Sequence, residues 1–454
     1  MASRRALRSL FLFFLVSGLG CLLAPVGLRA DGTDPTAAQL NALIQQNQSL
    51  QQQLQAQQQT IDALNARLTG LDQATARQEQ ELQSLRNRLG ETAPAASASA
   101  APASAVGEIR ISGEAGMGLF NSGSRGEYPN ADFRLDEARI FIDASAWKNA
   151  FLFTEIDLRT READDDGVYI GELYAGFENI SGSWGADDLL SARVGRFYIP
   201  FGEEYQKRMV LDDPLVSHSV TDIWGLDQGV EIYGKDGPFS YVGAIQDGGG
   251  NSLHNFEPDK SLIGRIGYDP TGWLHFSASA MRTGRLSAAG DQVSALWFTN
   301  GFFHALGPAA TTNEFDATLG ELDGAAQWAS GSVAAAGGVA NFDDSNPAGG
   351  DSRHMTYYYV EGTQQLLGQL LAAARFSHVN APGGYPLVGQ GNISTFLFGP
   401  LRTTSLSRLS LGLDYRFGPP LVLKVEYSPE WGHTLEGTSR NNEDILSTEL
   451  GVKF

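Results

Sequence analysis

Eight arginines are the side chains whose type and spacing point most directly to a chemistry. A ring of arginines around a narrow passage attracts anions, because each guanidinium keeps its positive charge. Many of the eight stand near carboxylates such as Asp136, Glu137, Asp157 and Asp414. Pairing with these carboxylates, which leaves the arginines to shape a passage without choosing anions, is the alternative. The eight pore-lining candidates are Arg134, Arg139, Arg159, Arg193, Arg196, Arg265, Arg408 and Arg416.

A second group of charges lies in residues 203–225, a segment too polar for a strand. Lys207 and Arg208 precede Asp212 and Asp213. Placed on opposite sides of a passage, the two pairs would create a transverse electric field. Two placements stay open, a constriction folded into the passage and a loop on the outer surface.

Catalytic and metal-binding chemistry find little support in the sequence. The only cysteine is Cys21, and the seven histidines have no HxxxH or HExxH spacing, so we expect no metal site and no cofactor. His218 between Ser217 and Ser219 is the one local hint of a hydrolase, and serine-rich loops make such adjacency common. We predict that the protein is not an enzyme. With 52 acidic against 32 basic residues, nucleic acid is also excluded as a partner.

Strands must position these residues, as the segment from Ser407 to Ser428 illustrates. Leu411 and Leu413 alternate with polar residues such as Asp414, and the alternation resumes after a Gly-Pro-Pro turn. Since successive strand side chains point to opposite faces, this is a hairpin with one apolar and one charged face. A soluble sandwich and a membrane barrel both present such a hairpin.

The connections favour the membrane barrel. Some are tight turns, and others are long and acidic, which is typical of outer-membrane barrels. Residues 107–454 suffice for about 16 antiparallel strands, and a barrel of that size encloses an aqueous channel. Aromatic residues flank the tight turns, where a membrane-interface girdle is expected. They are Trp147, Tyr233, Phe239, Tyr268, Trp273, Trp328 and Phe417.

Three segments precede the barrel. Residues 1–30 have the basic start and apolar run of a signal peptide. Residues 37–90 are predicted to form an α-helical coiled coil in the periplasm, because eleven of the fifteen a and d positions between Leu40 and Leu89 are Leu or Ile. Leucine at most a positions does not favour a dimer, so we expect a homotrimer. Residues 91–106 are an Ala/Ser/Pro linker.

The chain ends on an alternating strand that closes with Phe454. A terminal aromatic residue on such a strand resembles the signal by which bacterial outer-membrane barrels are recognised for assembly. The expected partners are therefore the barrel-assembly machinery and outer-membrane lipid.

Several motifs resemble the phosphate-selective porins O and P. SARVGRFYIPFG (191–202) is similar to the family's RVGQFKVPFG, and GLDQGVEIYG (225–234) and LIGRIGYDP (262–270) are similar to two further strands. The similarity covers most of residues 107–454 and thins between about 285 and 400. It implies a 16-stranded trimeric outer-membrane channel, often with an N-terminal coiled coil. The net charge of −20 departs from what phosphate selection would need.

The predicted function is that of an outer-membrane porin, a passive diffusion channel for ions and small hydrophilic solutes, with phosphate or other anions as candidates. The alternative is a structural tether that links the outer membrane to the periplasmic cell wall through the coiled coil.

Overall fold

A computed structural model describes residues 108–126, 128–159, 168–207, 209–248, 259–288, 312–346, 348, 350–387 and 402–454. The predicted signal peptide, coiled coil and linker lie outside the described residues, as do Arg208 and the side chain of Arg159. In the described part of the chain, no helix is long and apolar enough to cross a membrane.

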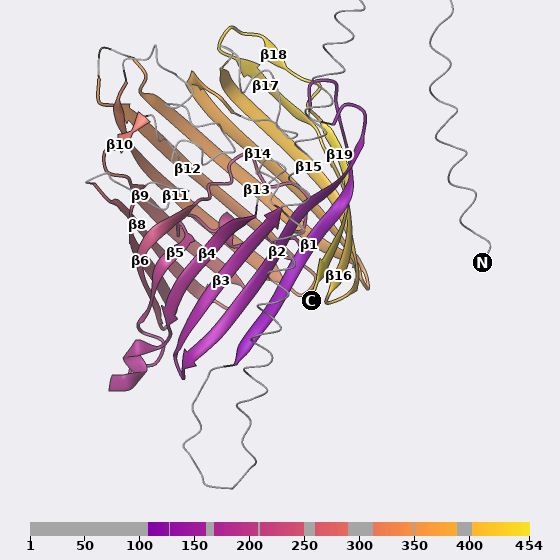
Figure 1. Cartoon of the computed structure of the whole chain (residues 1–454). Helices are drawn as coiled ribbons and strands as arrows, with labels where there is room; N and C mark the ends of the chain where they lie inside the picture. Colours follow the sequence, from indigo (N-terminus) through magenta and orange to yellow (C-terminus); the bar gives the residue numbers. More distant parts are fainter. Residues whose placement is uncertain are drawn as a thin grey trace, which may run out of the picture. The chain divides into compact units, whose positions relative to one another are not determined.

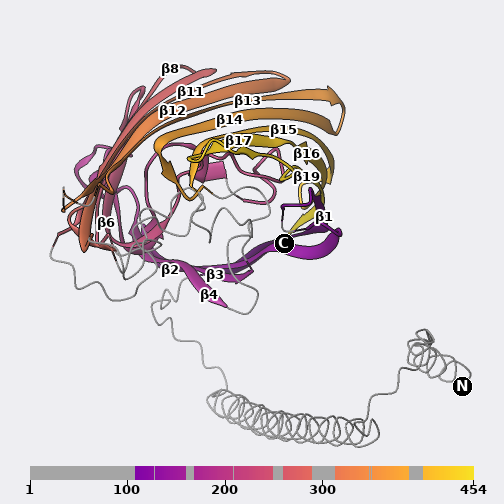
Figure 2. The ribbon, with the colours of Figure 1, turned by 90° about the horizontal axis from the view of Figure 1, so that it is seen from above.

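Sixteen antiparallel strands form one closed barrel, as the alternation predicts (Figures 1 and 2). Each pairs with the next along the chain, and β16 and β17 form one strand interrupted at Pro429, which has no N–H to donate. Two short pieces, β10 (Leu286–Ser287) and β18 (Ser439–Arg440), extend the sheet. The main strands are β1 (Ile109–Ser122), β2 (Asp132–Trp147), β3 (Ala150–Arg159), β4 (Tyr169–Phe177), β5 (Ser191–Tyr198), β6 (Leu226–Asp236), β7 (Phe239–Gln246), β8 (Ser261–Thr271), β9 (Leu274–Arg282), β11 (Glu314–Trp328), β12 (Gly331–Asp344), β13 (Arg353–Leu367), β14 (Leu370–Tyr385), β15 (Thr403–Gly418), β16 (Leu421–Ser428) with β17 (Glu430–Thr434), and β19 (Ile445–Lys453).

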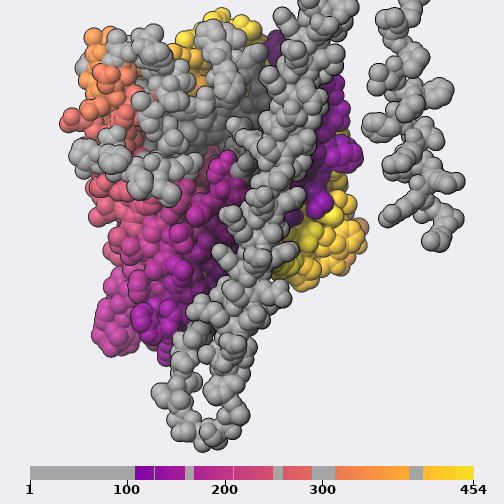
Figure 3. Space-filling view, in the orientation of Figure 1, coloured from indigo at the N-terminus to yellow at the C-terminus, as the bar shows by residue number. Residues whose placement is uncertain are grey.

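Hydrogen bonds between the first and last strands close the barrel. Met117 of β1 lies opposite Leu450 of β19. Just beyond β19, the Phe454 N–H donates to Gly113 O at 2.9 Å and the Gly113 N–H donates to Phe454 O at 3.1 Å. In the space-filling view the C-terminal strands (yellow) accordingly lie beside the N-terminal strands (indigo) (Figure 3). A closed sheet leaves no unpaired edge, which is a condition for crossing lipid.

The two faces of the barrel wall differ in polarity. In β15, Leu411 and Leu413 are 48% and 47% exposed on the outside, whereas Ser410 and Asp414 on the inside are buried. An apolar outer wall with aromatic residues at the short turns suits a lipid bilayer. The outward aromatic residues beside those turns, each at least 40% exposed, are Trp147, Phe239, Tyr268, Trp273, Trp328 and Phe417.

Tyr233 is an exception to the predicted girdle. Its neighbour Ile232 faces outward and is 48% exposed, so Tyr233 lies on the inward face. There its hydroxyl donates a hydrogen bond to Glu178 at 2.6 Å. The alternation of β6, rather than the nearby turn, decides where this ring points.

The connections divide into short turns at one end and longer loops at the other. Two residues join β2 to β3, and two prolines join β15 to β16. At the short end, residues 178–190 form a longer connection that contains the 3-10 helix η1 (Ile180–Trp184). At the other end, residues 199–225 join β5 to β6 and contain η2 (Glu204–Lys207). This segment is called the inward loop below.

Candidate functional site: the lumen and its inward loop

The inward loop lies inside the barrel, the first of the two placements that its sequence leaves open. Arg375 of β14 lies halfway around the ring from β5, yet its Nη1 donates to Ser217 O of the loop at 2.6 Å. Lys424 Nζ of β16 donates to Leu215 O at 3.0 Å. The loop therefore leaves the wall at β5, crosses the lumen and is held by strands on the other side.

Glu426 of β16 is the second anchor of the loop. Its Oε2 accepts hydrogen bonds from the backbone N–H groups of Val216 (2.6 Å) and Ser217 (2.8 Å), and its Oε1 accepts from the Ser217 hydroxyl. On the β1 side, Glu114 Oε1 accepts from the Val210 N–H at 3.2 Å. Hydrogen bonds to a charged acceptor are stronger than neutral ones, so buried carboxylates hold this stretch of backbone in place.

Asp213 connects the loop to the wall through an ion pair. Arg375 Nη2 lies 2.9 Å from Asp213 Oδ1, and His218 Nδ1 lies 3.2 Å from Asp213 Oδ2. Burial alone would raise the pKa of Asp213, but the Arg375 charge and the hydrogen bond from His218 lower that pKa below its ordinary value. Asp213 is therefore a carboxylate at neutral pH.

The other charges predicted to oppose one another have different surroundings. Lys207 at the end of η2 and Asp212 are exposed, whereas Asp213 is buried against Arg375. Arg208 lies outside the described residues. An opposed field between the loop's own charges therefore stays a prediction, and Asp213 contributes its charge to the far wall.

The described candidate arginines all have partners. Arg139 is the most enclosed, with Glu137, Glu155 and Asp157 at 3.3, 3.4 and 3.7 Å. Arg193 lies 2.9 Å from Glu231. In the same way, Arg134 pairs with Asp136 (3.4 Å), Arg265 with Glu203 (3.3 Å) and Arg408 with Glu430, while Arg196 donates to Gly171 O (3.0 Å) and Arg416 to Leu211 O (3.3 Å).

Carboxylates outnumber basic groups inside the barrel. Of the charged side chains buried in the described residues, 19 are Asp or Glu and 7 are Arg or Lys. Because low-dielectric walls focus an electric field, this excess gives the lumen a negative potential even where pairs form.

An apolar cluster fixes the two ends of the inward loop. Phe201 and Ile223 pack with inward-facing residues of the wall such as Phe315, Phe342 and Met355, all at most 4% exposed. The alternation of β11 contained this signal, because Phe315, Ala317 and Leu319 share its inward face. That half of the wall is apolar on both faces, which a search for polar lumen residues misses.

Arg375, Lys424 and Glu426 were also missed as candidates. Lys424 and Glu426 belong to the polar face of the predicted hairpin, so their inward direction was predictable. Arg375 lies where the motif similarity thins. In none of the three cases does the alternation say what lies across the lumen.

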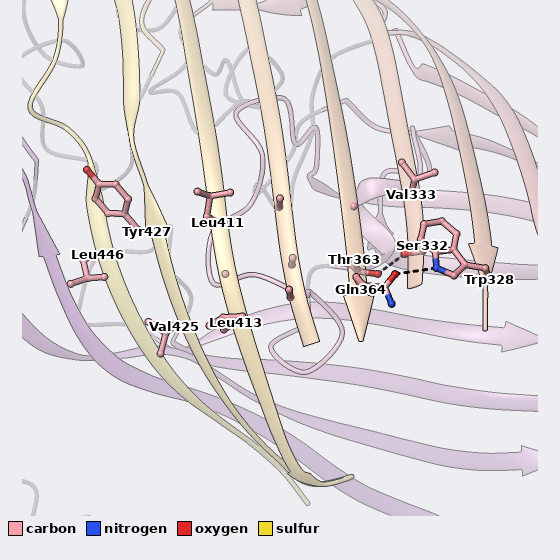
Figure 4. A pocket seen from close by; sticks show the side chains of 15 residues that line it. Trp328, Ser332, Val333, Thr363, Gln364, Leu411, Leu413, Val425, Tyr427 and Leu446 are labelled. Atoms are coloured by element: carbon pink, nitrogen blue, oxygen red, sulfur yellow. Dashed lines mark hydrogen bonds between the residues drawn. The ribbon is translucent and has the colours of Figure 1, made fainter. Parts of the chain in front are cut away.

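A groove on the outer wall is separate from this site (Figure 4). Its volume is about 750 Å³, and it is lined by outward residues including Leu411, Leu413 and Val425. Small residues of β14, Ala372 and Ala374, also line it. Since these side chains face the lipid side of the wall, the groove is no part of the channel.

Comparisons with known proteins identify the fold. No protein-family model and no curated protein sequence matches the chain. Among solved structures, the outer membrane channel DcaP of Acinetobacter baumannii aligns with a TM-score of 0.53 and 11% identity, over 76% of this chain and 97% of that one. A loop L8 deletion mutant of OmpT, an outer membrane protein of Vibrio cholerae, gives 0.50 and 13%, over 77% and 100%. The chain shares the barrel fold of these outer-membrane proteins.

Proposed function

We propose that the protein is an outer-membrane porin, a passive diffusion channel for ions and small hydrophilic solutes that the inward loop narrows. The anchoring of this loop carries the proposal: buried Arg375, Lys424 and Glu426 hold its backbone across a charged lumen. Desolvating charged groups costs free energy, and a barrel that served only as an anchor could fill its interior with apolar side chains. A polar interior inside an apolar wall is typical of porins.

We further propose that the channel prefers cations. The excess of buried carboxylates supports this preference, because the candidate arginines are engaged by carboxylates or backbone carbonyls. The second candidate solute class, phosphate or other anions, is supported by the motif similarity to phosphate-selective porins. It requires that an arginine release its carboxylate when an anion arrives, at the cost of leaving that carboxylate unpaired.

The proposed assembly is a homotrimer in the outer membrane, with the coiled coil in the periplasm. The heptad pattern of residues 40–89 supports it. One solved OmpT structure with a TM-score of 0.50 is of a trimer form. The tether remains an additional proposed role, supported by the length of the heptad segment, and the strand ending at Phe454 is the proposed contact for the assembly machinery.

Conductance of the purified protein in a planar bilayer tests the channel. We expect discrete steps in KCl and, across a salt gradient, a reversal potential on the cation-selective side. An anion-selective reversal potential together with block by added phosphate would favour the second solute class. Absence of steps from protein that is folded and inserted would contradict the channel and leave the tether.

Deletion of residues 31–106 tests the assembly. If the coiled coil holds the trimer, the detergent-extracted deletion variant should have the mass of one subunit, whereas an unchanged mass would assign trimer stability to the barrel wall. Loss of attachment of the outer membrane to the cell wall in cells that carry this variant is the outcome expected of a tether.

A further inference from the structure

Four inward-facing aromatic rings form a strip along the wall made by β2, β3 and β4. Phe141 and Phe153 stack with ring centroids 6.2 Å apart, Phe153 and Tyr174 lie 5.3 Å apart, and Phe151 meets Tyr174 edge-on at 6.1 Å. Figure 2 shows these three strands side by side in one wall. The rings below are called the aromatic strip.

The strip faces the lumen. Phe151 and Phe153 share their face of β3 with Glu155, which is fully buried, while Leu152 and Leu158 on the other face are 47% and 44% exposed. Tyr174 packs against the apolar cluster inside the barrel. A Cβ built at Gly176 would lie 2.4 Å from the Phe151 ring, so the glycine leaves room for that ring above the strand.

The rings of the strip are not core residues. All four are partly exposed, in contrast to Phe315 and Phe342 of the apolar cluster, which are fully buried. Aromatic rings that stay accessible in a polar lumen are costly to leave in water and offer their faces to a solute.

The charges beside the strip decide which solutes fit. Arg193 already lies over the Tyr174 ring, with Cζ 5.1 Å from its centroid, so this face binds a cation within the protein itself. Carboxylates are in excess here, because Glu172 and Glu231 share Arg193, and Asp143 stands opposite Phe153 in the β2–β3 register. Electron-rich ring faces and a negative potential both favour positive charge.

We propose that the aromatic strip is a binding subsite for solutes that carry a flat apolar ring and a positive charge, so that such organic cations dwell in the channel during passage. The inference rests on the proposed porin function and deepens it by naming a solute class. The ring stacks on Phe153 or Tyr174, and the cationic group lies toward the carboxylates.

Block of KCl current by three probes tests the subsite. Benzyltrimethylammonium carries a ring and a positive charge, tetramethylammonium carries the charge alone, and benzoate carries a ring with negative charge. We expect benzyltrimethylammonium to reach half-block at a concentration at least about fivefold lower than either other probe, the size expected for a cation on an aromatic face. Equal block by the two cations, or strongest block by benzoate, would overturn the subsite.

Variants assign the effect to the strip. Phe153→Leu and Tyr174→Leu keep apolar volume and remove the ring face, and each should raise the half-block concentration of benzyltrimethylammonium about fivefold when scaled to its own KCl current. Phe276→Leu is the matched control, because Phe276 is 46% exposed on the outward face of β9. Unchanged block in both strip variants would overturn the inference alone, whereas a wild-type protein without KCl current would overturn the porin function as well.

Discussion

The Arg375 guanidinium of β14 lies 2.9 Å from the Asp213 carboxylate of the inward loop. These two residues are 162 positions apart in sequence, and their contact joins the loop to the wall opposite its origin. Arg375 also pairs with Glu361 of β13 and donates to Ser217 O. A single side chain thus compensates two buried carboxylates and one carbonyl, which makes it the central anchor of the loop.

Arg375→Met should strongly destabilise the barrel and release the loop. The variant leaves Asp213 and Glu361 buried without their cation, and breaking a buried pair in this way costs about 3–5 kcal/mol. Urea unfolding in phospholipid vesicles, followed by tryptophan fluorescence, measures the loss. In single-channel records, we expect a noisier open state than in the wild type, because the loop has lost its tie to β14.

Two further variants separate the anchor from a general loss of charge. Asp213→Asn combined with Arg375→Met removes both charges of the contact, so the double variant should recover part of the lost stability. Arg110→Met is the surface control, since Arg110 pairs only with exposed Glu108 before the first turn of β1 and should unfold like the wild type. Equal effects of the Arg375 and Arg110 variants would contradict the assigned role.

Acid should weaken the loop contact only at low pH. Because the pKa of Asp213 in the folded protein lies below its ordinary value of about 3.9, the ionised carboxylate stabilises the fold fully above that value. This contribution is lost as the pH falls through the lowered pKa. Unfolding free energies of the wild type and Asp213→Asn, both in a His218→Gln background that removes the imidazole, should differ by a constant amount from pH 7 to about 4.5. A difference that already shrinks near pH 6 would contradict this assignment.

The strands and their faces could be read from the sequence because a period of two leaves little choice when one face meets lipid. Leu411 and Leu413 must face outward, and Asp414 must then face inward. The barrel closure through β19 follows from the same pattern. The inward loop could not be placed in this way, because its anchors Arg375 and Glu426 come from distant strands and alternation carries no information across the lumen.

The aromatic strip was also readable in part. Phe151 and Phe153 stand at the same parity as Glu155 and Asp157, so a polar face that contains phenylalanine was visible in β3. Attention to the charged members of that face hid the rings. The contact of Phe153 with Tyr174 depends on a shift in register between β3 and β4, which no local pattern predicts.

Arg193→Gln should increase the proposed cation preference. Arg193 compensates Glu231 at 2.9 Å and Glu172 at 3.6 Å, and glutamine leaves both carboxylates without a cationic partner. We expect the ratio of K⁺ to Cl⁻ permeability, measured from reversal potentials, to rise by a factor on the order of two. Glu231→Gln should change the ratio in the opposite direction. If Arg193→Gln instead favours Cl⁻, the lumen charge near β5 does not govern selectivity.

Gly113→Val should impair closure of the barrel. A Cβ at Gly113 would lie 2.7 Å from both the Phe454 ring and the Arg139 carbonyl oxygen, so valine must displace the terminal residue whose backbone pairs with this position. Overpacking of this kind costs about 1–3 kcal/mol, which heat-modifiability on gels and urea unfolding can measure. Gly264→Ala is the matched control, because only Val242 O comes within 4.0 Å of its Cβ position. Folding of Gly113→Val as stable as that of Gly264→Ala would mean that Phe454 contributes nothing to closure, and its value would then lie in recognition during assembly.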